Sequence, residues 1–281
     1  MHTGKTIQII VVLLFFLLIE KSSAQNRPIG TIKVDNGVFI DQTEIDVGSW
    51  LSYYTWLLNY KGYKVAQKAL PDSSTIDSEV WRYIRKRTSK YNNKMALYSG
   101  QPIGFFEKKC DVVKNLGARI PSTKLCPILY LPITGLTYEQ VTEFCEWRTA
   151  VQGQGDFVFR LPTPEEWTKI ALDGLTTSEK ENGFRDSVND KGCPLFNYSS
   201  TNCSDFPYQG LLNGIGLYSP DKLGLFDIWG NVSEMTTEKG LAKGGNFTLH
   251  ANQSHYDSIQ RYTKPEAWLG FRCIAVKKRE S

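Results

Sequence analysis

Two acidic residues flank a Gly-Asn bend in the stretch GLFDIWGNVSEM, which covers residues 224–235. Asp227 precedes the bend and Glu234 follows it, so both carboxylates can point at one place together with main-chain carbonyls such as those of Gly230 and Val232. Calcium takes six to eight oxygen ligands and accepts such mixed sets. The alternative is a hairpin whose acids face water. The spacing alone favours the hairpin, because acids near a turn are common.

Two histidines lie in one short segment, and His2 is the only other histidine of the chain. They are His250 and His255, with Tyr256 and Asp257 beside them. Imidazole suits copper, iron and zinc, so a divergent metal site is one interpretation. The other is a pair of polar residues on an exposed loop. We favour that interpretation, because two histidines without a paired third ligand are a weak signal.

The N-terminus indicates export. Lys5 precedes an apolar run from Ile9 to Ile19, and small residues follow at 22–24. Residues 1–24 are therefore expected to be a cleaved secretory signal, and residues 25–281 the mature domain. A membrane anchor is the alternative, but the run falls short of the ~20 apolar residues that a spanning helix needs. We expect a secreted, periplasmic or envelope protein with no membrane span after signal removal.

Export changes the interpretation of the six cysteines. An even number in an oxidising compartment is most simply a set of disulfides. No two of them form a Cys-x-x-Cys pair, which argues against zinc and redox motifs. Cys110 with Cys126, and Cys193 with Cys203, are plausible local pairs. All six lie in the mature part: Cys110, Cys126, Cys145, Cys193, Cys203 and Cys273.

Length and composition indicate one globular domain. The chain has 281 residues, of which 41% are hydrophobic and 22% charged, enough for a sizeable core. Its net charge of +4 is too weak and too evenly spread to suggest nucleic acid as a partner. The basic runs at residues 85–87 and 277–279 are short enough to be solvated surface or tail.

The elements that must position these residues are few and short. A strand is predicted at 38–40, and a helix follows whose apolar residues recur at three-and-four spacing from Trp50 to Leu58. Capping boxes at Thr137 and Thr163 start two further helices, the second ending at Gly174. From about 175 to 222 the chain is rich in Ser, Asn, Asp and Gly. A loop of that length is either functional or is held in place by something other than a ladder of hydrogen bonds.

Six segments occur in the order of a known family: FIDQTEIDVGSWLSYYTW, LPITGLTYEQVTEFCEW, FRLPTPEEWTKIA, GLFDIWGNVSEM, KGGNF and LGFRC. Together they cover nearly the whole mature chain, which resembles the formylglycine-generating-enzyme (sulfatase-modifying factor) family. The resemblance implies an α+β, C-type-lectin-like fold, with short strands and a few helices between long irregular loops.

The resemblance implies two calcium sites. At the Gly-Asn bend we therefore prefer a metal site to a hairpin whose acids face water. The first would use Asp227, Gly230, Val232 and Glu234. The second would lie near Asn197 and Tyr198, where the loop departs from the family pattern.

The resemblance also implies a disulfide between Cys145 and Cys273, the alternative being two buried free thiols. It places Arg272 at a family position, where we expect it to anchor a buried carboxylate or carbonyl, and we expect the same of Arg160.

The chemistry of the family is where the match fails. Active members bind copper(I) through two cysteine thiolates after the Gly-Gly motif and oxidise a sulfatase cysteine to formylglycine. Leu249 and Ser254 stand at these two positions, and no cysteine lies between Cys203 and Cys273. Copper(I) is a soft ion that prefers thiolates. Copper is therefore not expected, and the activity is improbable.

We therefore expect a non-catalytic binding protein that is stabilised by calcium and disulfides and binds a protein or glycan ligand. Similar exported proteins occur in bacterial gliding motility and type IX secretion, which suggests an envelope scaffold. The recognition surface would combine residues 175–222 and 246–264, whose Tyr, Asn and Ser content suits adaptable contacts. The alternatives are a divergent oxidase that uses His250 or His255, and a lectin-like ligand-display protein.

Overall fold

The computed structural model describes residues 27–89, 128–153, 155–182, 188, 192, 194–199 and 210–278. The predicted signal and four cysteines, Cys110, Cys126, Cys193 and Cys203, lie outside these residues.

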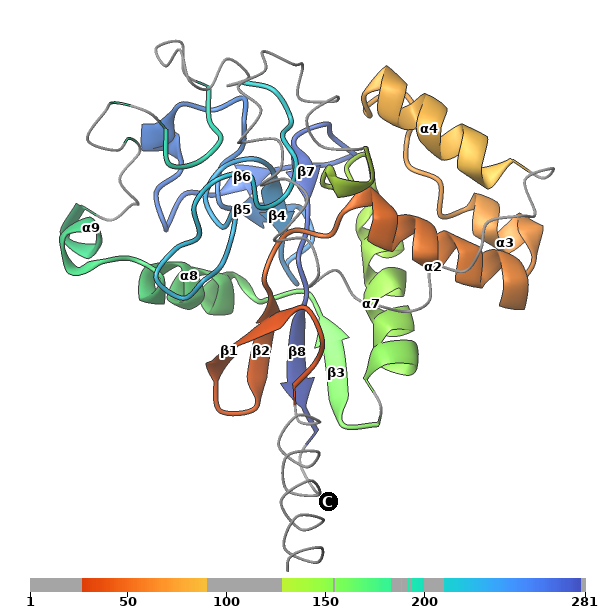
Figure 1. The fold of residues 1–281 in the computed structure, drawn as a ribbon, viewed down its shortest axis with the longest axis horizontal. Helices are drawn as coiled ribbons and strands as arrows, with labels where there is room; N and C mark the ends of the chain where they lie inside the picture. The colour runs from red at the N-terminus through yellow and green to blue at the C-terminus, as the bar shows by residue number, and fades with distance from the viewer. Residues whose placement is uncertain are drawn as a thin grey trace, which may run out of the picture.

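The first sheet joins the two ends of the described chain. Its antiparallel strands are arranged in the order β1-β2-β8-β3. They are β1 (Thr31–Asp35), β2 (Val38–Asp41), β8 (Ile274–Lys277) and β3 (Phe157–Arg160). Ile40 lies opposite Ile274, so the strand predicted at 38–40 is confirmed and pairs with the last strand of the chain. Figure 1 shows this sheet below the rest of the molecule.

The second sheet carries one of the two acids at the bend. Its order is β6-β5-β4-β7, and only the β4–β7 pair is parallel. The strands are β4 (Ser233–Met235), β5 (Leu241–Lys243), β6 (Gln260–Arg261) and β7 (Leu269–Gly270). Glu234 lies in the central strand β4, opposite Lys243 and Gly270.

The helices lie on both sides of the sheets (Figure 1). On one side are α2 (Val47–Tyr60), α3 (Tyr63–Gln67), α4 (Ser78–Thr88) and α7 (Tyr138–Gln152). On the other are α8 (Pro164–Asp173) and α9 (Thr177–Asn182). Two short 3-10 helices, η2 (Ile128–Tyr130) and η3 (Ala251–Gln253), complete the set.

Both predicted capping boxes are confirmed. The Thr137 hydroxyl accepts a hydrogen bond from the backbone N–H of Gln140, and the Gln140 side chain accepts one from the backbone of Thr137. Thr163 and Glu166 exchange the same pair of bonds at the start of α8. Each box satisfies amides that a helix start leaves without an intrahelical partner.

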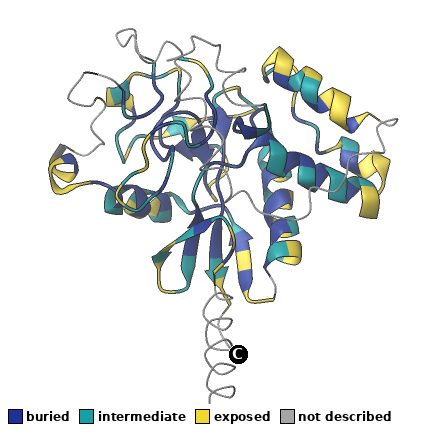
Figure 2. Cartoon of the chain, viewed as in Figure 1, coloured by how far each residue is buried: buried dark blue, intermediate teal, exposed yellow. Residues whose placement is uncertain are grey.

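Two clusters of buried side chains form the core. Figure 2 colours the buried residues dark blue along the chain. In the first, Trp50 of α2 stacks on Phe144 of α7 with ring centroids 5.3 Å apart. Of the predicted inward face of α2, Leu58 alone is only half-buried. In the second cluster, Trp167 of α8 meets Trp229 edge to face at 6.1 Å. The bend at 230–231 directly follows this second cluster.

A buried carboxylate caps α2. Asp46 accepts a hydrogen bond from the backbone N–H of Ser49 at 2.7 Å and is almost fully buried. Burial raises the pKa of Asp46 to about 7, against the opposing effect of the bond from Ser49. The folded protein therefore holds a proton at Asp46 that the unfolded chain, with an aspartate pKa of about 4, releases.

This difference predicts a loss of stability as pH rises. Between about pH 4 and 7 the folded state binds the extra proton, so each pH unit lowers the free energy of unfolding by about 1.4 kcal/mol through this group. Asp46→Asn keeps a good capping side chain but cannot titrate. Urea unfolding across this pH range should give a shallower decline for Asp46→Asn than for the wild type.

The matched control is Asp77→Asn. Asp77 also caps a helix, accepting from the backbone of Glu79 and Val80, but it is exposed. The change in slope should be confined to the Asp46 variant, and parallel curves for the wild type and Asp46→Asn would contradict the assignment.

Candidate functional site

The bend at 227–231 has a left-handed backbone at three residues. Asp227 and Asn231 have φ angles of 53° and 54°, which residues with a side chain rarely adopt. Gly230, with φ 74°, has no room for a side chain, because a Cβ there would lie 2.1 Å from the carbonyl oxygen of Asn197. Such a conformation persists only where the surrounding contacts determine it.

The side chain of Asn231 supplies these contacts. Its Oδ1 accepts from the side chain of Asn197 at 2.9 Å and from the backbone N–H of Asn213 at 3.1 Å. Its Nδ2 donates to Glu44 Oε1 at 3.0 Å and to the carbonyl of Asn213 at 3.2 Å. The fully buried amide thus makes four hydrogen bonds and joins three distant segments to the bend.

Glu234 forms a buried ion pair with Arg272. The Arg272 Nε lies 2.6 Å from Glu234 Oε1, and the indole N–H of Trp167 donates to Oε2 at 2.8 Å. Arg272 also donates to the carbonyls of Phe226 at 2.9 Å and Asp41 at 3.2 Å. The prediction that Arg272 anchors a buried carboxylate is confirmed.

Arg160 also fits its prediction. It binds Glu166 through two hydrogen bonds of 2.7 Å and donates to the carbonyl of Leu161 at 2.9 Å. Glu166 is the residue that closes the capping box of α8, so Arg160 supports a structural contact.

Negative charge exceeds positive charge in this buried cluster. Glu44, Asp227 and Glu234 are all buried, whereas Arg272 is the buried cation among them. Burial raises the pKa of Glu44 well above its usual range, the charge of Asp227 raises it further, and Arg272 opposes the rise. Burial also raises the pKa of Glu234, against the effect of Arg272. Such an excess is relieved by a bound proton or by a cation.

The predicted calcium ligands fit this cluster only in part. Asp227 and Glu234 lie close enough to influence each other, and the charge excess suits a cation. However, both oxygens of Glu234 already accept from Arg272 and Trp167, and Asp227 Oδ2 accepts from the backbone N–H of Gly216 at 2.6 Å. Within the described ranges, no three His, Cys, Asp or Glu side chains group to hold a metal. Calcium at Asp227, Gly230, Val232 and Glu234 stays a prediction.

The second predicted calcium position lies directly against the bend. Asn197 is fully buried, and its carbonyl accepts from the backbone N–H of Asn231 at 2.8 Å. Its Oδ1 accepts no hydrogen bond from the part of the chain that the structure describes. Tyr198 is buried, with its ring 5.0 Å from that of Phe196. A calcium held by Asn197 and Tyr198 stays a prediction.

Cys145 and Cys273 meet as two buried thiols. Their sulfurs are 3.4 Å apart, which is a contact and not a bond. Burial raises the pKa of the Cys273 thiol well above its usual range, and Cys145 adds to the rise. Beside them Arg148 and Asp41 form a buried ion pair of 2.6 Å. The structure brings the predicted partners together, and their oxidation stays a prediction.

The two positions that we expect to match the family's copper thiolates, Leu249 and Ser254, flank η3. Leu249 is half-buried, and its carbonyl accepts from the backbone N–H of Ser199 at 2.8 Å. Ser254 is buried and packs against the Gly-Gly motif, where a Cβ on Gly245 would lie 1.9 Å from the Ser254 hydroxyl oxygen. Neither side chain is a donor that copper(I) prefers.

The two histidines differ in their surroundings. His250 is exposed at the start of η3, where its backbone N–H donates to Gln253. His255 is half-buried, contacts the carboxylate of Asp257 and packs on the ring of Tyr256. No metal-holding group of side chains includes either histidine within the described residues.

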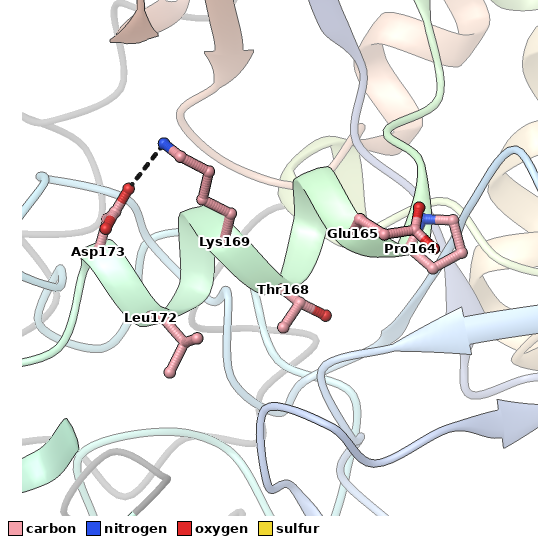
Figure 3. A pocket seen from close by; sticks show the side chains of 6 residues that line it. All are labelled: Pro164, Glu165, Thr168, Lys169, Leu172 and Asp173. Atoms are coloured by element: carbon pink, nitrogen blue, oxygen red, sulfur yellow. Dashed lines mark hydrogen bonds and ion pairs between the residues drawn. The ribbon is translucent and has the colours of Figure 1, made fainter. Parts of the chain in front are cut away.

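A hollow beside α8 was not predicted from the sequence. Its volume is about 420 Å³, and Figure 3 shows its lining residues along one helix: Pro164, Glu165, Thr168, Lys169, Leu172 and Asp173. Thr168 lies 3.5 Å from the carbonyl oxygen of Tyr256, so the hollow borders the segment 246–264. In the sequence these residues look like an ordinary solvated helix face.

Comparison with known structures defines the fold class. CarF matches with 17% sequence identity and a TM-score of 0.50 over 85% of this chain and 86% of its own. Together with the mixed architecture this confirms the α+β, C-type-lectin-like fold. The Treponema denticola variable protein 1 matches with 14% identity and a TM-score of 0.44 over 90% of this chain and 92% of its own. PvdO from Pseudomonas aeruginosa matches with 16% identity and a TM-score of 0.42.

The match to PvdO covers 53% of this chain and spans 63% of PvdO. The search of curated proteins found no match. The sulfatase-modifying factor enzyme 1-like domain matches residues 15–277. The chain therefore belongs to the sulfatase-modifying factor family. Within the described part of the chain, every helix is too short or too polar to cross a membrane.

Replacing Gly230 tests whether the close approach at the bend is essential. Gly230→Ala should lower the free energy of unfolding by more than about 3 kcal/mol, because the new Cβ must displace the backbone of Asn197. Gly155→Ala is the control, since Gly155 has φ 84° but no atom within 4 Å of an added Cβ. Its cost should be only the conformational penalty of about 1–2 kcal/mol. Equal losses in chemical unfolding would argue against a tightly determined bend.

Proposed function

We propose that the chain is an exported, non-catalytic member of its family that binds a protein or glycan ligand as a scaffold of the cell envelope. The observation that carries this proposal is the pair of residues, Leu249 and Ser254, at the family's copper-ligand positions. A leucine has no lone pair to give, and a serine hydroxyl is a hard, weak ligand for copper(I). The scaffold would then keep its fold and have lost its oxidase chemistry.

The recognition surface proposed for this binding is the segment 246–264 with the loop 175–222. Its support is the hollow along α8, which borders Tyr256 and is lined by both charges and an apolar residue. A concave surface with a few polar groups is the usual form of a ligand site. The loop lies in part outside the described residues.

Restoring the thiolates tests the loss of copper chemistry. Leu249→Cys/Ser254→Cys should bind one copper(I) per chain, because both positions that flank η3 would again carry a soft donor. Leu249→Cys alone is the matched control and should bind copper(I) far more weakly. Competition against a copper(I) chelator measures both.

The wild type should bind no stoichiometric copper or iron after purification, and it should consume no oxygen with a thiol peptide. A transition metal at one equivalent together with oxygen consumption would overturn the proposal and favour the divergent oxidase. Calcium-dependent glycan binding would instead identify a lectin-like ligand-display protein.

Calcium is the second part of the proposal, and the excess negative charge around Asp227 supports it. The ion would be held by Asp227 and by carbonyl oxygens of the bend, with Glu234 shared between it and Arg272. Calcium bound only to the folded state at 100 times its Kd adds about 2.7 kcal/mol of stability.

Thermal unfolding with calcium and with chelator tests this site. The wild-type Tm should rise with calcium, whereas Asp227→Ala should have a lower Tm that no longer responds. Asp173→Ala removes an exposed carboxylate and should keep the response. A wild type that unfolds at the same temperature in calcium and in chelator would eliminate the site. Glu44→Gln would then test whether a bound proton relieves the excess instead. The glutamine amide resembles the protonated acid in shape but cannot lose a proton.

A further inference from the structure

Positive charge is concentrated in one segment of the chain, contrary to the even spread that we expected from the sequence. Residues 60–88 hold seven Lys or Arg residues and three Asp or Glu residues, a net charge of +4, which equals the formal net charge of all 281 residues. The three acids lie between residues 72 and 79, so the basic residues form two groups on either side of them. The first follows α2 and the second lies in α4: Lys61, Lys64 and Lys68, then Arg82, Arg85, Lys86 and Arg87.

The basic residues of α4 lie on its outer face. The helix buries Val80, Ile84 and Thr88, which recur every four residues. Arg82 and Lys86 lie four residues apart on the opposite face, Arg85 and Arg87 lie to either side of it, and all four are exposed. Figure 2 shows exposed residues along the outer side of α4. Among the described residues, none of the arginines at 82, 85 and 87 forms an ion pair.

Both basic groups belong to one surface. The hydroxyl of Tyr54 accepts a hydrogen bond from Gln67 of α3 at 2.5 Å and donates one to the carbonyl of Thr88 at the end of α4 at 3.2 Å. Figure 1 shows α3 and α4 together beside α2, away from the first sheet and α8.

Exposed apolar side chains lie among the first group of lysines. Tyr60, Tyr63 and Val65 expose 70%, 40% and 41% of their surface, and they lie within six residues of the chain. Lysines at 61, 64 and 68 alternate with them, and Lys61 lies over the ring of Trp56. In α4 the arginines at 85 and 87 lie over the rings of Trp81 and Tyr83. We call residues 60–68 together with the outer face of α4 the basic-aromatic surface.

We propose that the basic-aromatic surface binds the surface of an anionic phospholipid membrane. Basic side chains are attracted to such a surface, and tyrosine rings settle at the level of the lipid headgroups. Val65 distinguishes a lipid from a soluble polyanion, because an aliphatic side chain gains from apolar lipid and gains little from a nucleic acid or an acidic polysaccharide. The contact is peripheral and does not depend on the proposed calcium or on the copper-ligand positions.

Sedimentation with lipid vesicles tests the proposal. The purified chain should bind vesicles that contain phosphatidylglycerol, should not bind pure phosphatidylcholine, and should be released by high salt. Arg82→Glu/Arg85→Glu/Arg87→Glu should weaken binding at least about 100-fold, since each basic residue near an anionic surface contributes about fivefold. Lys33→Glu/Lys180→Glu/Lys222→Glu is the matched control, because it makes the same charge change at exposed positions elsewhere.

The apolar part has its own variant. Tyr60→Ser/Tyr63→Ser leaves the charge unchanged and should weaken vesicle binding about tenfold at the same salt concentration. Three results would overturn the proposal: no binding to the anionic vesicles, equal loss in the Lys33 control, or binding to dextran sulfate or single-stranded DNA without binding to vesicles. The last result would assign the surface to a soluble polyanion.

Discussion

The buried ion pair between Glu234 and Arg272 is the contact on which the other parts of this molecule depend. Arg272 lies just before the last strand, and Glu234 lies in the central strand of the second sheet. Through its remaining N–H groups Arg272 binds carbonyls at residues 41 and 226, and Glu234 receives the indole of Trp167 from α8. The pair therefore joins both sheets and a helix at one point. Removing one partner of such a pair commonly costs about 3–5 kcal/mol, because the other charge stays buried.

The bend at 227–231 lies next to this ion pair and is fixed by the side chain of Asn231. Its left-handed residues would be strained in isolation, and the four hydrogen bonds of the Asn231 amide determine their conformation. The same bonds bring Glu44 beside Asp227 and so create the excess of buried negative charge. The geometry and the electrostatics of the bend thus have one origin, since the amide that fixes the backbone also gathers the carboxylates.

Features set by neighbours in sequence could be predicted, and features set by distant contacts could not. The capping boxes depend on residues three positions apart, and the face of α2 depends on its own periodicity. The role of Arg272 followed from its place in an ordered set of motifs. Glu44 was missed, because its partner Asn231 lies 187 residues away and nothing near Glu44 marks it as buried. The basic-aromatic surface was missed for a related reason: the run at 85–87 looks short until the fold packs both α3 and α4 against α2.

The positions that differ from active family members lie apart from these contacts. Leu249 and Ser254 flank η3. Their segment contacts the bend earlier in the chain, where the backbone N–H of Phe247 donates a hydrogen bond to the carbonyl of Asn231. Neither residue takes part in the ion pair or in the amide network, so the loss of copper ligands that we propose for these positions would remove no contact that holds the sheets together. Ser254 is small enough to pack against the glycines of the Gly-Gly motif, although its buried hydroxyl has no hydrogen-bond partner among the described residues. The contacts that join the two sheets would therefore persist if the copper chemistry were lost, as we propose, and the loops and outer helices would remain available for binding.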